Sequence, residues 1–267
     1  MTESESVALP FGDSPLSCVV PHNKMYYIRF FFKMQAFFLI FLIFSNYRHS
    51  FAFLLFLLSS IFLFSCIKYS HYERQVFRMS YALLVNKSHT LSSSYVPPYL
   101  TEARIPFHAP AHHEKTLMEK AAAKSAAKLF HRAAAENITL MGVSGYRSYR
   151  RQEILYRNAL QRGSTAVAPP GTSEHQTGLA LDISCASLNF ELEEAFASTK
   201  EGKWLKANAP LYGFILRYPR RKEHITGYPW EPWHIRFVGK TLSLYLSLTG
   251  LTLEEYHDML PDSSQIR

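Results

Sequence analysis

The stretch Ser173-Glu-His-Gln-Thr-Gly-Leu-Ala-Leu-Asp182, together with Glu231-Pro-Trp-His234 further downstream, decides the interpretation of this chain. Between them the two segments supply imidazoles, carboxylates and a glycine turn. A catalytic zinc site typically has three protein ligands, with water in the fourth place and a nearby carboxylate that accepts its proton. We therefore expect an enzyme that carries such a site.

The residues after Gly178 predict a strand that carries one of the carboxylates. Apolar residues at 179, 181 and 183 alternate with Ala180, Asp182 and Ser184, as in a half-buried strand. Asp182 is thus expected to point away from the Leu and Ile side, and His175 to approach from the preceding loop.

The second segment is expected to be a loop that enters a strand. Proline at 229 and at 232 forbids a regular helix, so Glu231 and His234 cannot be placed by helical spacing. Along the strand that follows, Ile235 and Phe237 alternate with His234, which puts His234 on the face opposite the apolar pair.

Upstream, the pattern predicts an amphipathic helix over 114–135, a short buried strand over 137–143, and a helix over 149–161 with Ser148 as its N-cap. Arg147 and Gln152 then lie where a strand leads into a helix, a common place for ligand-binding side chains. Arg150 and Arg151 are expected on a solvated helix face. Two short helices are expected over 189–197 and 201–208, and a strand over 214–217.

Three separated motifs in the same order resemble one family. Ser-x-His-x-x-Gly-x-Ala-x-Asp followed by Glu-Pro-Trp-His is similar to the zinc D-alanyl-D-alanine carboxypeptidases of the VanY type, relatives of the lysostaphin and Hedgehog fold group. Ser144-Gly-Tyr-Arg-Ser148 with Gln152, and Gly213-Phe-Ile-Leu-Arg-Tyr218, fit the same family. The resemblance covers residues 116–239 and says nothing of the first hundred residues.

The resemblance implies a role for each motif residue. The implied Zn2+ ligands are His175, Asp182 and His234, and the implied general base is Glu231. The implied substrate contacts are Arg147, Gln152, Ser173 and Tyr218, of which the first three would grip the terminal carboxylate and Arg147 could instead polarise the scissile carbonyl. Two neutral imidazoles and one carboxylate leave zinc with a net positive charge, as activation of water requires.

We therefore expect an α+β domain whose small antiparallel sheet, flanked by helices, carries a zinc site. The expected activity is hydrolysis of the C-terminal D-alanine of peptidoglycan stem peptides. Alternatives are an L,D-carboxypeptidase or a peptidoglycan endopeptidase on the same site, or a cell-wall-binding module that keeps zinc without turnover. Retention of Glu231 argues against the last, because a structural zinc site has no use for a base.

The N-terminal region has a different composition, rich in Phe, Leu and Ile. Residues 1–33 are interpreted as a tail, 34–67 as a membrane anchor or signal region, 68–104 as a linker and 105–267 as the catalytic domain. The run 36–44 would span only about 13 Å as a helix, against about 30 Å for a bilayer core. The uncharged run 51–67 is at the lower limit for spanning. One pass, two passes, or a lipoprotein signal starting at Met34 remain alternatives, and export of the domain out of the cytoplasm is expected.

The formal net charge of +8 suits an anionic partner such as a cell wall or membrane surface, and no motif points to nucleic acid. Cys18 and Cys66 lie outside the predicted domain, which leaves Cys185 alone in it and excludes an intradomain disulfide. The sequence does not predict an oligomeric state.

Overall fold

The structure is a computed structural model that describes residues 81–164 and 167–260, all within one compact unit, His71–Arg267. The predictions for residues 1–33 and 34–67 lie outside the described residues. Within the two described ranges, no helix combines the length and the apolar character that a membrane span needs.

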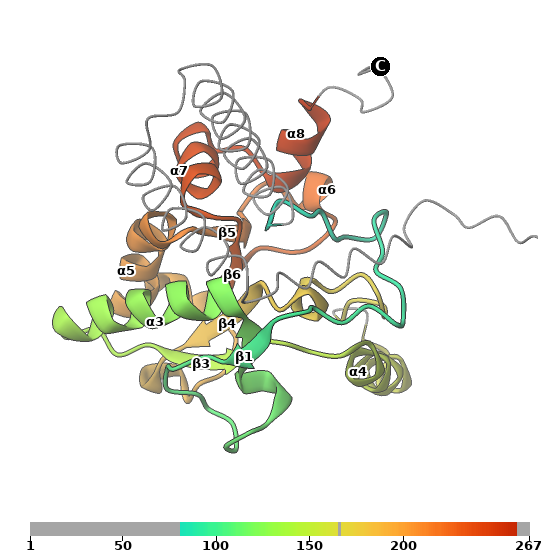
Figure 1. The fold of residues 1–267 in the computed structure, drawn as a ribbon, viewed down its shortest axis with the longest axis horizontal. Helices are drawn as coiled ribbons and strands as arrows, with labels where there is room; N and C mark the ends of the chain where they lie inside the picture. The colour runs from blue at the N-terminus through green and yellow to red at the C-terminus, as the bar shows by residue number, and fades with distance from the viewer. Residues whose placement is uncertain (1–80, 165–166, 261–267) are drawn as a thin grey trace, which may run out of the picture. The chain divides into compact units, whose positions relative to one another are not determined.

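A four-stranded antiparallel sheet lies at the centre of the fold (Figure 1). Its spatial order is β3 (Met141–Ser144), β4 (Ala180–Ser184), β6 (Glu231–Phe237) and β5 (Phe214–Tyr218). Strands β4 and β6 lie in the middle and pair directly, with Leu181 opposite Ile235 and Asp182 opposite His234. The sheet therefore brings residues that are far apart in the sequence into neighbouring positions.

A second, two-stranded antiparallel sheet consists of β1 (Leu100–Glu102) and β2 (Leu117–Glu119). It lies against the segments that follow β3 and precede β4, because the Tyr146 amide donates to the Leu117 carbonyl and the Glu119 amide donates to the Gly178 carbonyl. The predicted helix over 114–135 is therefore wrong at its start. Residues 114–116 form a 3-10 turn, 117–119 form β2, and the helix begins only after Glu119, whose side chain caps it.

The expectation of a linker is wrong for residues 81–104, the described part of the predicted 68–104 segment. Leu84 and Val85 are buried, β1 pairs with β2, and the carbonyls of Tyr81 and Leu83 accept hydrogen bonds from Arg236. A polar composition conceals this role, because the segment is held mostly through its backbone.

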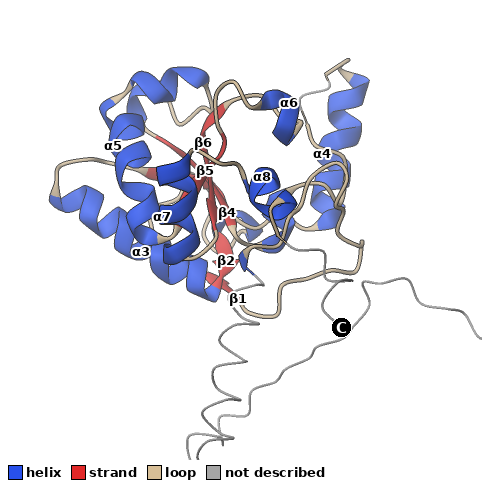
Figure 2. Ribbon diagram, turned by 90° about the horizontal axis from the view of Figure 1, so that it is seen from above, coloured by secondary structure: helices blue, strands red, loops and turns tan. Residues whose placement is uncertain are grey.

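Helices surround the two sheets, and the strands run between α3 and α5 on one side and α4 and α6 on the other in the view of Figure 2. Their bounds are α3 (Lys120–Ala135), α4 (Tyr149–Gln161), α5 (Lys200–Asn208), α6 (Glu223–Thr226), α7 (Lys240–Thr249) and α8 (Leu253–Asp258). Ser148 caps α4 as predicted, since its hydroxyl accepts from the Arg151 amide. The α+β class with a small antiparallel sheet is confirmed.

One face of the central sheet packs on the main core. Leu181 and Ile183 of β4 and Ile235 and Phe237 of β6 meet the apolar side of α3, which includes Leu129. Because side chains alternate along a strand, Asp182 and His234 must lie on the opposite face, as predicted. That opposite face holds the candidate site.

Two details of the strands differ from expectation. Strand β4 is buried along its whole length, not half-buried, because loops and the candidate site cover its second face. Strand β6 begins at Glu231 and includes Pro232, which was expected in a loop. Proline is tolerated there because the register between β5 and β6 shifts between Leu216 and Tyr218, so Pro232 has no paired residue.

The predicted helix over 189–197 is also wrong in its first half. Asn189 and Phe190 have positive φ angles of 50° and 64°, which a right-handed helix does not allow. Short 3-10 turns, Ala186–Leu188 and Glu194–Ser198, flank this irregular loop instead.

Candidate active site

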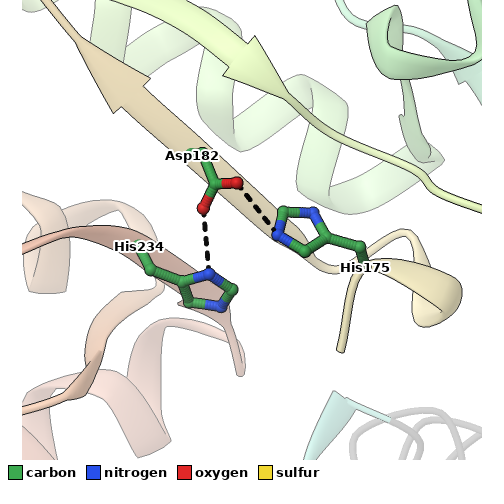
Figure 3. Close-up of side chains that lie close together, drawn as sticks. All are labelled: His175, Asp182 and His234. Carbon is green, nitrogen blue, oxygen red and sulfur yellow. Dashed lines mark hydrogen bonds and ion pairs between the residues drawn. The ribbon is translucent and has the colours of Figure 1, made fainter. Parts of the chain in front are cut away.

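The structure brings His175, Asp182 and His234 together on the covered face of the sheet (Figure 3). One donor atom from each residue lies within 4.8 Å of the other two, and all three side chains are buried. His175 Nε2 lies 3.1 Å from Asp182 Oδ2, and His234 Nδ1 lies 2.9 Å from Asp182 Oδ1. The three donors are close enough to share one cation.

Local structure explains how each donor reaches this point. Asp182 and His234 are direct cross-strand neighbours on β4 and β6. His175 comes from the 3-10 turn Glu174–Thr177, which ends at Gly178 with a φ of 67°. A side chain on Gly178 would meet the backbone nitrogen of Glu119 at 2.9 Å, so the turn that delivers His175 requires glycine.

The remaining nitrogen of each imidazole faces an acceptor. His175 Nδ1 lies 2.6 Å from the Gly145 carbonyl, which can only accept, so this nitrogen carries the proton and Nε2 keeps its lone pair. His234 Nε2 faces a carboxylate oxygen of Glu174 at 3.5 Å, which favours a proton on Nε2 and leaves Nδ1 as the nitrogen available to a metal. The other nitrogen of each ring, His175 Nε2 and His234 Nδ1, lies next to Asp182, where one metal ion could bind all three donors.

The site also shifts the proton affinities of its members. Burial alone would raise the pKa of Asp182, but the adjacent His175 and His234 hold it well below its usual value. Burial lowers the pKa of His175. Burial also opposes the charge on His234, yet hydrogen bonds to Asp182 and Glu174 outweigh it and raise the pKa of His234 to about 9. The raised pKa favours the charged form of His234, which forms a buried ion pair with Asp182.

Glu231 lies at the edge of the cluster, with Oε2 3.7 Å from His234 Nδ1. Its side chain is only partly exposed, and burial, followed by the nearby Asp182, raises its pKa to about 7 against the opposing effect of His234. A carboxylate with such a pKa can both accept and release a proton near neutral pH.

Arg147 lies beside the cluster, since its Nη2 lies 3.8 Å from Asp182 Oδ2. Its other contacts are a hydrogen bond from Nη1 to Gln152 Oε1 at 2.9 Å and one from Nη2 to Ser144 Oγ at 3.2 Å. The structure therefore joins Arg147 and Gln152 through a direct hydrogen bond. Ser173 is buried and does not cap its own 3-10 turn.

Tyr218 is buried beside the cluster, and its ring centre lies 4.9 Å from that of His234. The ring also packs on Tyr228, which donates from its hydroxyl to Thr172. Tyr218 therefore forms part of the wall behind His234.

A cavity of about 120 Å³ opens beside the site, and its lining includes Asp182, Arg147, Lys115, Arg151 and Leu192. The sequence did not predict Lys115 as part of the site. Arg151 was expected on a solvated helix face but lines the cavity, whereas Arg150 is exposed as expected. Burial, followed by the nearby Arg147 and Arg151, lowers the pKa of Lys115. The cavity is also lined by Glu114, so its three cations outnumber its two carboxylates and favour an anionic group.

Glu174 is the other residue that sequence reasoning missed. It lies inside the first motif, between Ser173 and His175, and is 1% exposed. The sequence shows a carboxylate inside the motif that supplies a zinc ligand. It does not show its partners, because Arg217 and Arg236 come from distant parts of the chain.

With this geometry in place, comparisons with known proteins identify the class. The VanY family, described as D-alanyl-D-alanine carboxypeptidase, matches residues 115–240. The chain belongs to this family, whose members are peptidases, and the recognition made from the motifs is confirmed.

Individual relatives are similar over about two thirds of the chain. The putative carboxypeptidase YodJ of Bacillus subtilis (strain 168) is 46% identical over 180 residues, which are 66% of each protein. The solved structure of the LdcB LD-carboxypeptidase has 46% identity and a TM-score of 0.64, over 67% of this chain and 86% of that one. A mutant of the vancomycin-resistance D,D-pentapeptidase VanY in complex with Zn(II) has 30% identity and a TM-score of 0.53, over 67% and 99%.

The cluster generates a first prediction about metal content. After exposure to zinc and dialysis, the full-length protein should hold one zinc ion per chain, as measured by plasma mass spectrometry. His234→Ala should retain little zinc, because it loses one of three donors. His112→Ala is the matched control: His112 is exposed, contacts Glu102 and lies outside the cluster, so its loss should leave zinc content unchanged. Equal zinc in all three proteins would contradict the site.

Proposed function

We propose that the protein is a zinc-dependent carboxypeptidase that removes the C-terminal D-alanine from peptidoglycan stem peptides. The observation that carries this proposal is the convergence of one donor atom each from His175, Asp182 and His234, with an acceptor behind each imidazole ring. The Zn(II) complex of a VanY relative supports zinc as the metal.

The donor set fits zinc by its chemistry. Two imidazoles and a carboxylate are typical of catalytic zinc sites, in which three protein ligands leave one coordination position open. The acceptors behind His175 and His234 would keep both rings neutral and oriented as ligands. When bound, zinc would supply a Lewis acid that polarises a peptide carbonyl and lowers the pKa of water.

Glu231 is the general base in this proposal. Its carboxylate takes a proton from the attacking water and then returns it to the leaving amine of D-alanine. Its position at the start of β6, three residues before His234, holds the carboxylate at the rim of the site.

The free carboxylate of the substrate requires a cation with directed N–H groups. Arg147, supported by Gln152 and Ser144, provides that fork next to Asp182. Gln152 is itself fixed by donating to the Ala168 carbonyl at 2.6 Å. Ser173 and Tyr218 are proposed as further substrate contacts.

A second candidate function is L,D-carboxypeptidase activity on tetrapeptides. The similarity to the LdcB LD-carboxypeptidase, at 46% identity, favours it specifically. Both reactions would use the same metal site, base and carboxylate fork, so they differ only in the residue that precedes the scissile bond.

We also propose that residues 34–67 anchor the chain in the membrane or direct its export, with the catalytic domain outside the cytoplasm. The uncharged run 51–67 and the extracellular location of peptidoglycan support this. In fractionated cells that express the full-length chain, the protein should be recovered with membranes and be degraded by protease added to spheroplasts. Recovery in the protected soluble fraction would contradict this proposal.

The function is tested by mass spectrometry of muropeptides before and after incubation with the zinc-loaded protein. Loss of one alanine from pentapeptides is the expected result, whereas loss from tetrapeptides alone would favour the L,D reaction.

Glu231→Gln should retain zinc and lose about 10²- to 10⁴-fold in turnover, because the base is gone. Full activity in this variant would remove Glu231 from the role, and binding to the wall without any product would indicate a binding module.

Arg147 is tested against its neighbour Arg150, which is exposed. Hydrogen bonds to charged groups contribute about 1.5–3 kcal/mol, and each 1.4 kcal/mol is tenfold, so Arg147→Gln should lower kcat/KM about 10- to 100-fold. Arg150→Gln should change it little. A rise in KM indicates binding of the terminal carboxylate, whereas a fall in kcat indicates polarisation of the scissile carbonyl. Equal kinetics in the two variants would exclude both roles.

A further inference from the structure

A buried network of charged side chains lies behind the candidate zinc site. Arg217 donates from Nε to Glu174 Oε1 at 2.7 Å and forms two hydrogen bonds with Glu254 of α8, at 2.8 and 2.6 Å. Arg236 donates from Nη1 to the same Glu174 oxygen at 2.7 Å. All four side chains are almost fully inaccessible to solvent.

The network is fixed from several directions. Asn86 donates to Glu254 Oε1 at 3.1 Å, and Arg236 also donates to the carbonyls of Tyr81 and Leu83. Strands β5 and β6, helix α8 and the segment 81–86 therefore all hold the network in place. The two arginines and two glutamates balance in charge, as such deep burial requires.

One carboxylate oxygen of this network, Glu174 Oε2, accepts no hydrogen bond from the other members. Both arginines bind Glu174 through Oε1, while Oε2 is buried and has no hydrogen-bond partner among the described residues. The same holds for His234 Nε2, which lies 3.5 Å from that oxygen. A buried acceptor and a buried imidazole nitrogen thus face each other, and neither has another partner in the described structure.

We propose that Glu174 is a positioning residue that orients His234 and keeps its proton on Nε2, so that Nδ1 is presented to the metal. The two arginines hold Oε1 and thereby turn Oε2 towards His234. This inference rests on the proposed zinc site and adds to it a residue that would not touch zinc or substrate.

The test compares two isosteric variants that each remove one carboxylate from the network. Glu174→Gln replaces the acceptor opposite His234 by an amide, whose N–H groups would favour the tautomer protonated on Nδ1. Glu254→Gln removes the same charge from the other end of Arg217 but has no contact with His234. Zinc affinity is measured by chelator competition in the full-length protein, and the melting temperature of the zinc-free protein monitors folding.

Glu174→Gln should bind zinc about 10- to 100-fold more weakly, the usual effect of losing a partner behind a metal-ligating histidine. Glu254→Gln should bind zinc as the wild type does, even though both variants lower the melting temperature. Equal weakening in the two variants would reduce Glu174 to a general structural role and overturn the proposal, as would unchanged affinity in Glu174→Gln. Failure of the wild type to bind zinc would instead reject the proposed function.

A measurement on the wild type keeps the inference testable if Glu174→Gln does not fold. In the protein labelled with 15N-histidine, the zinc-loaded form should show His234 protonated on Nε2 and coordinated through Nδ1, with the signal assigned from its absence in His234→Ala. A proton on Nδ1 and coordination through Nε2 would contradict the proposal.

Discussion

The antiparallel pairing of β4 with β6 is the constraint on which the rest of the structure depends. It places Asp182 directly opposite His234 on the face that turns away from the apolar core. A shift of one residue in this register would move both side chains to the other face. The core residues Leu181 and Ile235 pair in the same ladder, so the packing that stabilises the sheet also fixes the geometry of the site.

This arrangement buries several charged side chains on the second face of the sheet. Isolated buried charges are strongly destabilising, and the structure avoids them by pairing. Burial alone would raise the pKa of Glu174, but Arg217 and Arg236 hold it well below its usual value. The segment 81–86 and helix α8 complete this pairing, which explains why both are integral to the domain. Support of the site and stability of the fold are therefore difficult to separate.

Local patterns in the sequence predicted those features that depend on local spacing. The two-residue period of a strand was sufficient to place Asp182 and His234 on the non-core face. It failed for Pro232, because its acceptance in β6 depends on a register shift in a neighbouring strand. The surroundings of Glu174 and Arg151 were not predictable either, since their neighbours come from segments distant in the sequence.

The account is tested most directly by anomalous diffraction at the zinc absorption edge from crystals of the zinc-loaded protein. It predicts one strong peak about 2.0–2.2 Å from His175 Nε2, an oxygen of Asp182 and His234 Nδ1. A peak bound to other residues, or no peak among these three side chains, would contradict the claim that they form one metal site.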